Sequence, residues 1–249
     1  MRSAFVLACL GHLDQALFWH ETALGEARRL DHPPTLALAL ASIGISGWRA
    51  SLEPGSLLQY ADELLALAGE HGLGHFRMMA LIERGWCLAA LGCADEGIPP
   101  LAAGLAGLHD LGFILWRPWA LTLLGDACRM AGQWQTALEH LAEAQRLAEQ
   151  REERWFQAET LRLTGEVLLA SGDPAAAEAS YREALALAQQ QSARLWELRA
   201  AISLARLRRD QGKRAEARDL LAPVYGWFTE GFDAPVLQEA KALLEELAP

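Results

Sequence analysis

Glycines mark this sequence at a regular spacing of forty residues. Equivalent positions follow one another at steps of 40 residues, with one step of 41 near the N-terminus. These positions are Gly11, Leu52, Gly92, Gly132, Gly172 and Gly212. A fixed period between about 20 and 50 residues is typical of a solenoid, in which each unit packs on its neighbours. The spacing therefore predicts six repeat units in one domain that covers residues 1–249.

Small residues recur at two further positions of the later units. Seven residues before the turn stand Gly85, Gly125, Gly165 and Ala205, and five residues after it stand Gly97, Ala137, Ala177 and Ala217. Small side chains at matched positions let two helices approach closely. Each unit is therefore predicted to be an antiparallel helix hairpin whose first helix ends at the glycine.

The ends of the sequence differ from its middle. Asp233 and Pro235 can cap and start a helix, so a capping helix over about 235–247 is predicted to cover the last unit with its charged face. Only ten residues precede Gly11, too few for a full first helix. We therefore expect that the chain begins inside a repeat and is part of a longer protein.

The second helix of the third unit carries residues that disfavour a helix. Pro99 and Pro100 lie inside it together with three glycines. A proline in a helix interior costs about 3 kcal/mol and a glycine about 1 kcal/mol. The helix expected over 94–108 is therefore predicted to start late or to kink near the two prolines.

Composition and charge narrow the classes of function. The chain is 52% hydrophobic and 22% charged, which suits a folded protein with an extensive core. Its formal net charge of -10 disfavours nucleic acid as the main partner, because phosphate binding needs a basic surface. No apolar run approaches the ~20 residues that span a bilayer, so no membrane partner is expected. The four cysteines form no C-x-x-C pair, and a reducing, cytoplasmic location fits best.

The fifth unit resembles the tetratricopeptide motif in its small and aromatic positions. It reads GDPAAAEASYREAL from Gly172, and Asp173 and Pro174 can cap its second helix. The usual repeat has 34 residues, so the longer period predicts first helices of about 16 residues. The resemblance implies an all-α fold, a right-handed superhelical solenoid of about six helix hairpins plus a C-terminal capping helix.

The sequence from Arg151 onward resembles the C-terminal region of large bacterial signal-transduction ATPases. The residues that carry the resemblance lie at 152–169 and 198–247, above all in the segment LAPVYGWFTEGFD that begins at Leu221. In that family a regulatory ATPase module precedes such a helical array, and a class III nucleotide cyclase domain or a winged-helix DNA-binding domain stands at the N-terminus. The resemblance implies a sensor or scaffold arm. The chain itself has no G-x-x-x-x-G-K-[ST] loop, since arginine follows Gly212-Lys213.

The tetratricopeptide resemblance also implies a binding surface, because first helices line the concave side of such arrays. The predicted partner-binding groove consists of Met79, Ile82, Trp86, Trp119, Thr122, Asp126, Arg129, Glu159, Arg162, Glu166, Arg199, Ile202, Arg206 and Arg209. It is predicted to change from apolar to mixed and then to basic, which suits a protein or peptide with an apolar end and an acidic end. The ATPase module of the same polypeptide is one candidate partner. The alternative is that these charged residues only form ion pairs along their own helices and that the groove binds nothing.

Aromatic residues form a further series with the same period. Phe76, Trp116, Phe156 and Trp196 stand near the starts of successive first helices, and packing between repeats is the favoured interpretation of them. A second hypothesis for function is a small-ligand sensor, which would bind a metabolite inside the superhelix between Trp86 and Trp119. A closed cavity of roughly 300 to 1,000 Å³ would favour the sensor, and an open trough would favour a peptide.

Motifs for catalysis have simpler explanations. Gly44, Ser46 and Gly47 lack the spacing of G-x-S-x-G and lie in a helical pattern. His71 and His75 flank a loop without the further ligands that a metal site needs. We therefore predict a non-catalytic protein with no cofactor and no metal, while its oligomeric state stays open.

Overall fold

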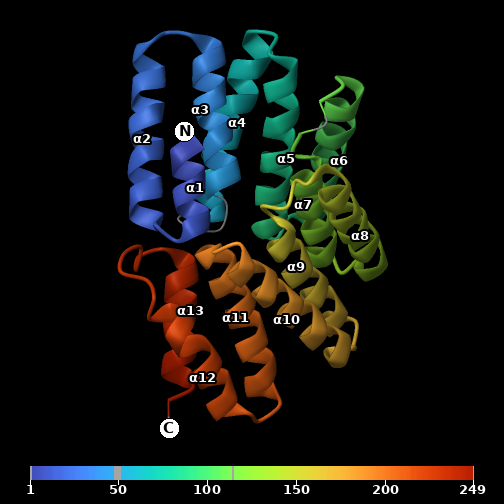
Figure 1. Ribbon diagram of the computed structural model, residues 1–249. Helices are drawn as coiled ribbons and strands as arrows, with labels where there is room; N and C mark the ends of the chain where they lie inside the picture. Colours follow the sequence, from blue (N-terminus) through green and yellow to red (C-terminus); the bar gives the residue numbers. More distant parts are fainter. Residues whose placement is uncertain (1, 48–51, 114, 249) are drawn as a thin grey trace.

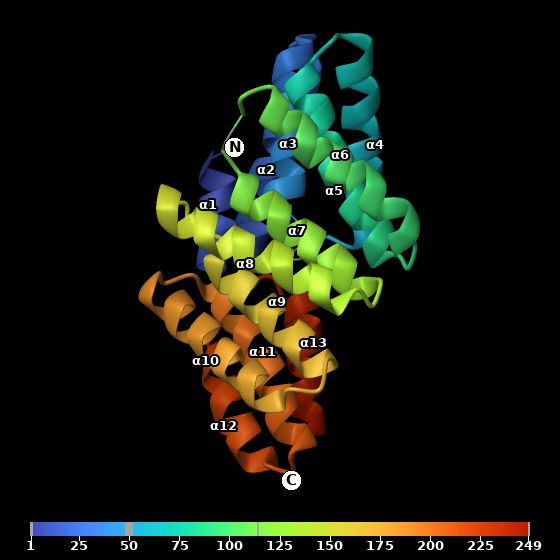
Figure 2. The same cartoon turned by 90° about the vertical axis from the view of Figure 1, so that its right-hand side faces the viewer.

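The computed structural model describes residues 2–47, 52–113 and 115–248, and these residues form thirteen α-helices and no strand (Figure 1). The helices are α1 (Arg2–Leu10), α2 (Leu13–Arg29), α3 (Pro33–Gly47), α4 (Pro54–Glu70), α5 (Gly74–Ala90), α6 (Ala94–Asp110), α7 (Arg117–Met130), α8 (Trp134–Arg151), α9 (Gln157–Ala170), α10 (Pro174–Gln190), α11 (Arg194–Asp210), α12 (Arg214–Tyr225) and α13 (Pro235–Glu246). The first twelve pair as six hairpins, which stack one after another (Figure 2). The predicted all-α repeat solenoid is confirmed.

The turn glycines have a conformation that explains their period. Those at residues 11, 92, 132, 172 and 212 have φ between 73° and 93°, in the left-handed region that ends many helices. A second series with nearly the same period lies between hairpins, at Asp31, Gly72, Gly112, Glu152 and Ser192, with φ between 48° and 68°. This second series is hard to see in the sequence because only two of its five members are glycine.

The two helices of a hairpin approach as closely as the small residues allow. A Cβ atom on Gly97 would lie 2.2 Å from the carbonyl oxygen of Gly85, so α5 and α6 could not meet this way with larger residues. In the fifth unit a Cβ on Gly165 would lie 2.5 Å from the ring of Tyr181. The predicted close approach at these positions is therefore confirmed.

The predicted late start of α6 is wrong, while the alternative, a kink near the two prolines, stays a prediction. The helix begins at Ala94 and continues through Pro99 and Pro100 to Asp110. The carbonyls that lose their intrahelical partners belong to Asp95 and Glu96, which are exposed, so water can bond them. The close contact with α5 holds the other side of the helix, and tertiary packing here outweighs local helix propensity.

The superhelix closes on itself, because α1 contacts α11 as well as α2 and α3 (Figure 1). The backbone N–H of Gly231 donates to Asp14 Oδ2 at 2.9 Å, and Gln15 Nε2 donates to Glu230 Oε2 at 3.1 Å. The first hairpin therefore lies against the loop between α12 and α13. Within the described part of the chain, no helix is long and apolar enough to cross a membrane.

Candidate functional site

Most of the predicted groove is buried. Nine of its fourteen residues are buried, namely Met79, Ile82, Trp86, Trp119, Thr122, Asp126, Glu159, Arg162 and Ile202. The side chains of Arg129, Glu166, Arg199 and Arg209 are partly buried, and that of Arg206 is 47% exposed. For the nine buried residues the prediction of one continuous open groove is corrected, since together they expose little surface. Trp86 and Met79 reach accessible space only where they line the two cavities described below.

Contacts between successive first helices explain this burial. Trp86 Nε1 on α5 donates to Asp126 Oδ2 on α7 at 2.9 Å. The hydroxyls of Thr122 on α7 and Thr160 on α9 share a hydrogen bond of 2.8 Å. The face expected to point into an empty groove therefore joins α5 to α7 and α7 to α9.

A buried charge cluster continues this ladder to α11. Glu159 accepts from Arg162 Nε at 2.8 Å and from Arg199 Nε at 3.0 Å. Arg162 also pairs with Glu166 at 3.0 Å, and Ser203 Oγ donates to Glu166 at 2.6 Å. Burial by itself would lower the pKa of Arg162, but the two carboxylates outweigh it and raise that pKa above its usual value. The arginine therefore stays charged inside the protein.

The predicted basic end of the groove is neutralised by α13. Arg206 pairs with Glu239 at 2.6 Å, and Arg209 pairs with Glu246 at 2.9 Å. Both carboxylates come from the capping helix, and they balance the charges of Arg206 and Arg209 in the fold. An acidic partner would have to displace these carboxylates.

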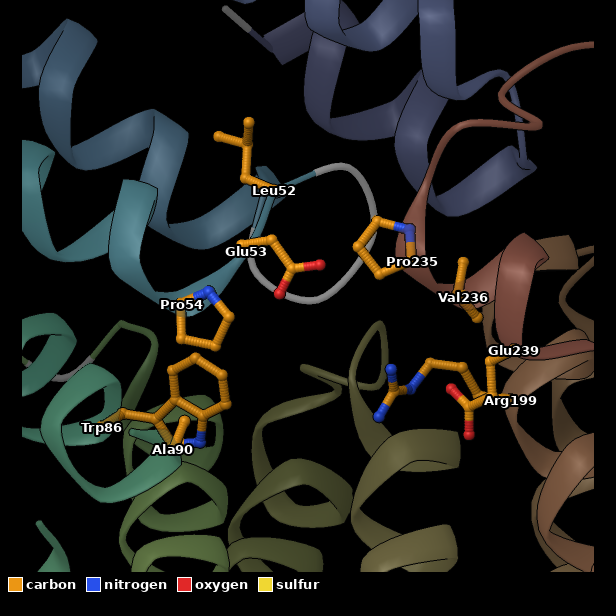
Figure 3. A pocket seen from close by; sticks show the side chains of 9 residues that line it. All are labelled: Leu52, Glu53, Pro54, Trp86, Ala90, Arg199, Pro235, Val236 and Glu239. Carbon is orange, nitrogen blue, oxygen red and sulfur yellow. The ribbon is translucent and has the colours of Figure 1, made fainter. Parts of the chain in front are cut away.

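Two residues of the predicted groove, Trp86 from the third unit and Arg199 from the sixth, line the same open cavity of about 250 Å³ in the closed superhelix. Its lining consists of Leu52, Glu53, Pro54, Trp86, Ala90, Arg199, Pro235, Val236 and Glu239. Figure 3 shows the ring of Trp86 next to Pro54 on one side and Arg199 with Glu239 on the other. We call this the Trp86–Arg199 cavity. Closure of the superhelix brings its two halves together, and this is why a linear repeat pattern does not predict the site.

A larger cavity of about 500 Å³ has aromatic walls. Its lining consists of Phe5, Leu38, Ala41, Ser42, His75, Phe76, Met79, Phe113, Leu115, Trp116, Glu153 and Trp155. The first helices α7 and α9 have 14 residues where α5 and α11 have 17. The residues not wound into these two helices lie in the loops before them, and those loops supply Trp116, Glu153 and Trp155. We call this the aromatic cavity.

Of the four aromatic residues that recur with the forty-residue period, two pack in the core and two line this cavity. Phe156 and Trp196 are buried and contact each other edge to face, with ring centroids 5.1 Å apart, which confirms the packing interpretation for this pair. Phe76 and Trp116 are partly buried and line the aromatic cavity. Trp119, expected beside a metabolite, is buried and lines neither of the two cavities named here.

The histidines and cysteines singled out in the sequence lie apart in the structure. Among the described residues no group of three or more His, Cys, Asp and Glu side chains could hold a metal ion. His71 is exposed, whereas His75 is partly buried at the start of α5. The four cysteines are free, and burial raises the pKa of Cys87 to about 12, which makes this thiol unreactive.

Comparison with known proteins finds a family match for part of the chain and solved structures with a similar fold. The tetratricopeptide repeat family model matches residues 116–190. The apo form of RapI is similar with a TM-score of 0.67 and 14% identity, over 98% of this chain and 82% of RapI. A Rap protein complexed with competence and sporulation factor has a TM-score of 0.57 and 14% identity, over 99% of this chain and 71% of that one.

A third similar structure contains nearly identical tetratricopeptide-like repeats of a putative kinesin light chain from Podospora anserina. It has a TM-score of 0.52 and 19% identity, over 80% of this chain and 94% of that one. No curated protein matches the sequence. The chain thus contains a tetratricopeptide-type region, and these structures share its fold.

Proposed function

We propose that this chain is a non-catalytic protein-protein interaction module that binds a segment of a protein partner at the Trp86–Arg199 cavity. The observation that carries the proposal is that Trp86 from the third unit and Arg199 from the sixth unit line one open cavity. Tryptophan and arginine are the residue types most enriched among interface hot spots. A volume of about 250 Å³ is below the roughly 300 Å³ of typical small-molecule sites, and it suits a side chain of a larger partner.

The charges of the cavity favour a segment with a basic residue. Arg199 already pairs with Glu159, and Glu239 pairs with Arg206. Glu53 is exposed at the cavity and forms no ion pair with another described residue. The proposed segment therefore places an apolar side chain against Trp86 and an arginine or lysine near Glu53, in contrast to the acidic partner expected from the sequence.

The similar structures support a binding role in general terms. One of them is a Rap protein complexed with competence and sporulation factor, so a superhelix of this fold holds a partner in that case. The resemblance of residues 152–169 and 198–247 supports a finer proposal. In it the chain is the cytoplasmic sensor arm of a multidomain bacterial signalling ATPase or transcriptional regulator, and the ATPase module of the same polypeptide is the partner.

Site-specific photo-cross-linking tests the binding proposal. Ala90 lines the cavity at the end of α5, whereas Ala142 is exposed on α8 and provides a matched control. Each alanine is replaced by p-benzoylphenylalanine in the source cells, and cross-linked peptides are mapped by mass spectrometry. We expect a defined partner segment from position 90 but not from position 142. Equal or absent labelling from position 90 would refute the site.

The gene sequence tests the finer proposal separately. An in-frame nucleotide-binding domain upstream of these residues is expected. A gene without one would remove the ATPase context and leave the interaction module standing.

A further inference from the structure

The aromatic cavity combines an apolar wall with an acidic group that can accept hydrogen bonds. Five aromatic rings line it, from Phe5, Phe76, Phe113, Trp116 and Trp155. The rings contact one another around the cavity, with centroids 4.7 Å apart for Phe5 and Trp155 and 5.8 Å apart for Trp116 and Trp155. Such rings present negatively polarised faces, and these attract cations.

Glu153 is the acidic group of this cavity. Its Oε1 accepts the backbone N–H of Trp116 at 2.9 Å, and the Trp155 side chain hydrogen bonds to its carboxyl group. Within the described part of the chain, no lysine, arginine or histidine lies at ion-pair distance from it. Burial raises the pKa of Glu153, and the hydrogen bonds from Trp116 and Trp155, together with the charge of Arg151, offset this only in part. A ligand that brought a positive charge would therefore stabilise the carboxylate.

His75 also lines the cavity, but its Nδ1 has almost no accessible surface. This nitrogen has no hydrogen-bond partner among the described residues. Burial lowers the pKa of His75, so the ring is neutral near pH 7. Ser42 already donates its hydroxyl proton to the carbonyl of Leu38 at 2.6 Å.

The backbone at Trp116 is held in a strained conformation. Trp116 has φ of 70°, a region that residues other than glycine seldom adopt, whereas the φ of 56° at Glu152 belongs to the turn series between hairpins. The bond from Trp116 N–H to Glu153 joins the loop before α7 to the loop before α9, in consecutive units. Residues in such conformations cluster at binding sites, where the surrounding structure fixes them.

We propose that the aromatic cavity binds a small apolar primary amine in its ammonium form, with the aromatic rings around the apolar body and the charge, and Glu153 accepting from the ammonium group. The volume of about 500 Å³ lies within the roughly 300 to 1,000 Å³ of small-molecule sites. This inference goes beyond the proposed protein partner, because the two cavities share no lining residue. Either site can fail in experiment without the other.

Calorimetry with probes of matched shape tests the charge preference. 4-Phenylbutylammonium is titrated into the whole chain and compared with neutral 4-phenylbutan-1-ol and anionic 5-phenylpentanoate. We expect the cation to bind about tenfold or more tightly than the alcohol, and the anion to bind weakest. Equal affinity for cation and alcohol, or no binding of the cation at millimolar concentration, would overturn the proposal without the need for any variant.

Two variants of equal charge change locate the site. Glu153→Gln keeps an acceptor for the N–H of Trp116 but removes the negative charge, and it should abolish the preference for the cation. Glu152→Gln changes the exposed neighbouring carboxylate and should leave that preference intact. Persistence of the preference in Glu153→Gln would contradict the assignment.

A peptide probe distinguishes the source of the ammonium group. The tripeptide Phe-Gly-Gly with a free N-terminus is compared with its N-acetylated form. Weaker binding of the free tripeptide than of 4-phenylbutylammonium supports a small free amine. If the free tripeptide instead binds more than tenfold tighter than 4-phenylbutylammonium, and acetylation abolishes that binding, the small-molecule assignment is overturned. The ammonium group would then belong to a protein N-terminus.

Discussion

Trp86 and Asp126 hold the same position in two successive units and are joined by a hydrogen bond of 2.9 Å from the indole Nε1 to Oδ2. Both residues are buried, and Arg129 Nε donates to the other carboxylate oxygen at 2.9 Å. Trp86→Phe keeps most of the apolar ring and removes the donor. A buried charged acceptor that loses a donor costs about 1–3 kcal/mol, and we expect a loss of that size in the free energy of unfolding from urea denaturation. Trp134→Phe, at a more exposed tryptophan, should change it little.

The cluster around Glu159 should be more sensitive. Its carboxylate is buried and pairs with Arg162 and Arg199, so Glu159→Gln leaves two poorly solvated guanidinium groups without their main counter-charge. Breaking a buried ion pair from one side costs about 3–5 kcal/mol. The thermal midpoint of Glu159→Gln should therefore fall by many degrees. In the matched variant Glu178→Gln, the partner Arg182 is 62% exposed and the loss should stay below about 1 kcal/mol. Similar losses in the two variants would contradict the structural role given to the cluster.

These residues also show how far the sequence predicts the structure. The forty-residue period predicts the hairpins, and the small residues at Gly85 and Gly97 predict how closely two helices meet. The period alone does not show how tightly neighbouring first helices pack, and so Trp86 and Glu159 were expected in a groove. Closure of the superhelix depends on contacts between Asp14 and Gly231, which are 217 residues apart and outside any repeat pattern. The Trp86–Arg199 cavity depends on this closure, and the aromatic cavity depends on the late starts of α7 and α9.

Glu83 should make stability depend on pH. Its side chain is buried on α5, Oε1 has no hydrogen-bond partner among the described residues, and burial raises its pKa well above 4.5. A carboxyl group whose pKa is raised in the folded state stabilises the fold at low pH, and this contribution is lost as the pH rises from about 4.5 through the folded-state pKa. Glu83→Gln should therefore be more stable than the wild type at pH 7, by about 1–3 kcal/mol, and the difference should shrink toward pH 4.

Chemical denaturation of Glu83→Gln and of the wild type between pH 4 and 8 measures this difference. Glu70→Gln, at an exposed position on α4, is the control and should show a small difference that does not change with pH. A constant gap between Glu83→Gln and the wild type would mean that Glu83 titrates normally.

Two glycines inside helices should respond to alanine with opposite signs. A Cβ on Gly25 in α2 would meet no atom within 4 Å, whereas a Cβ on Gly97 would lie 2.2 Å from the carbonyl oxygen of Gly85. Gly25→Ala should raise the free energy of unfolding by about 0.5–1 kcal/mol, because alanine has the higher helix propensity. Gly97→Ala must push α5 and α6 apart and should lower it. Urea denaturation of the two variants measures both effects, and a gain in both would mean that the hairpin tolerates a wider spacing.

The closure of the superhelix should be separable from the stability of its units. Asp14 accepts the N–H of Gly231, and a Cβ on Gly11, which has φ of 92°, would lie 2.9 Å from the ring of Trp227. Asp14→Ala removes a charged acceptor, so the contact should weaken by about 1.5–3 kcal/mol. Because the helices α5 to α10 do not use this contact, hydrogen exchange should speed up by about tenfold or more in α1 and α2 and stay unchanged in the middle units.

Asp62→Ala, which removes the exposed partner of Arg84, is the control and should leave α1 and α2 protected. Faster exchange throughout the chain after Asp14→Ala would show instead that closure and unit stability form one cooperative transition.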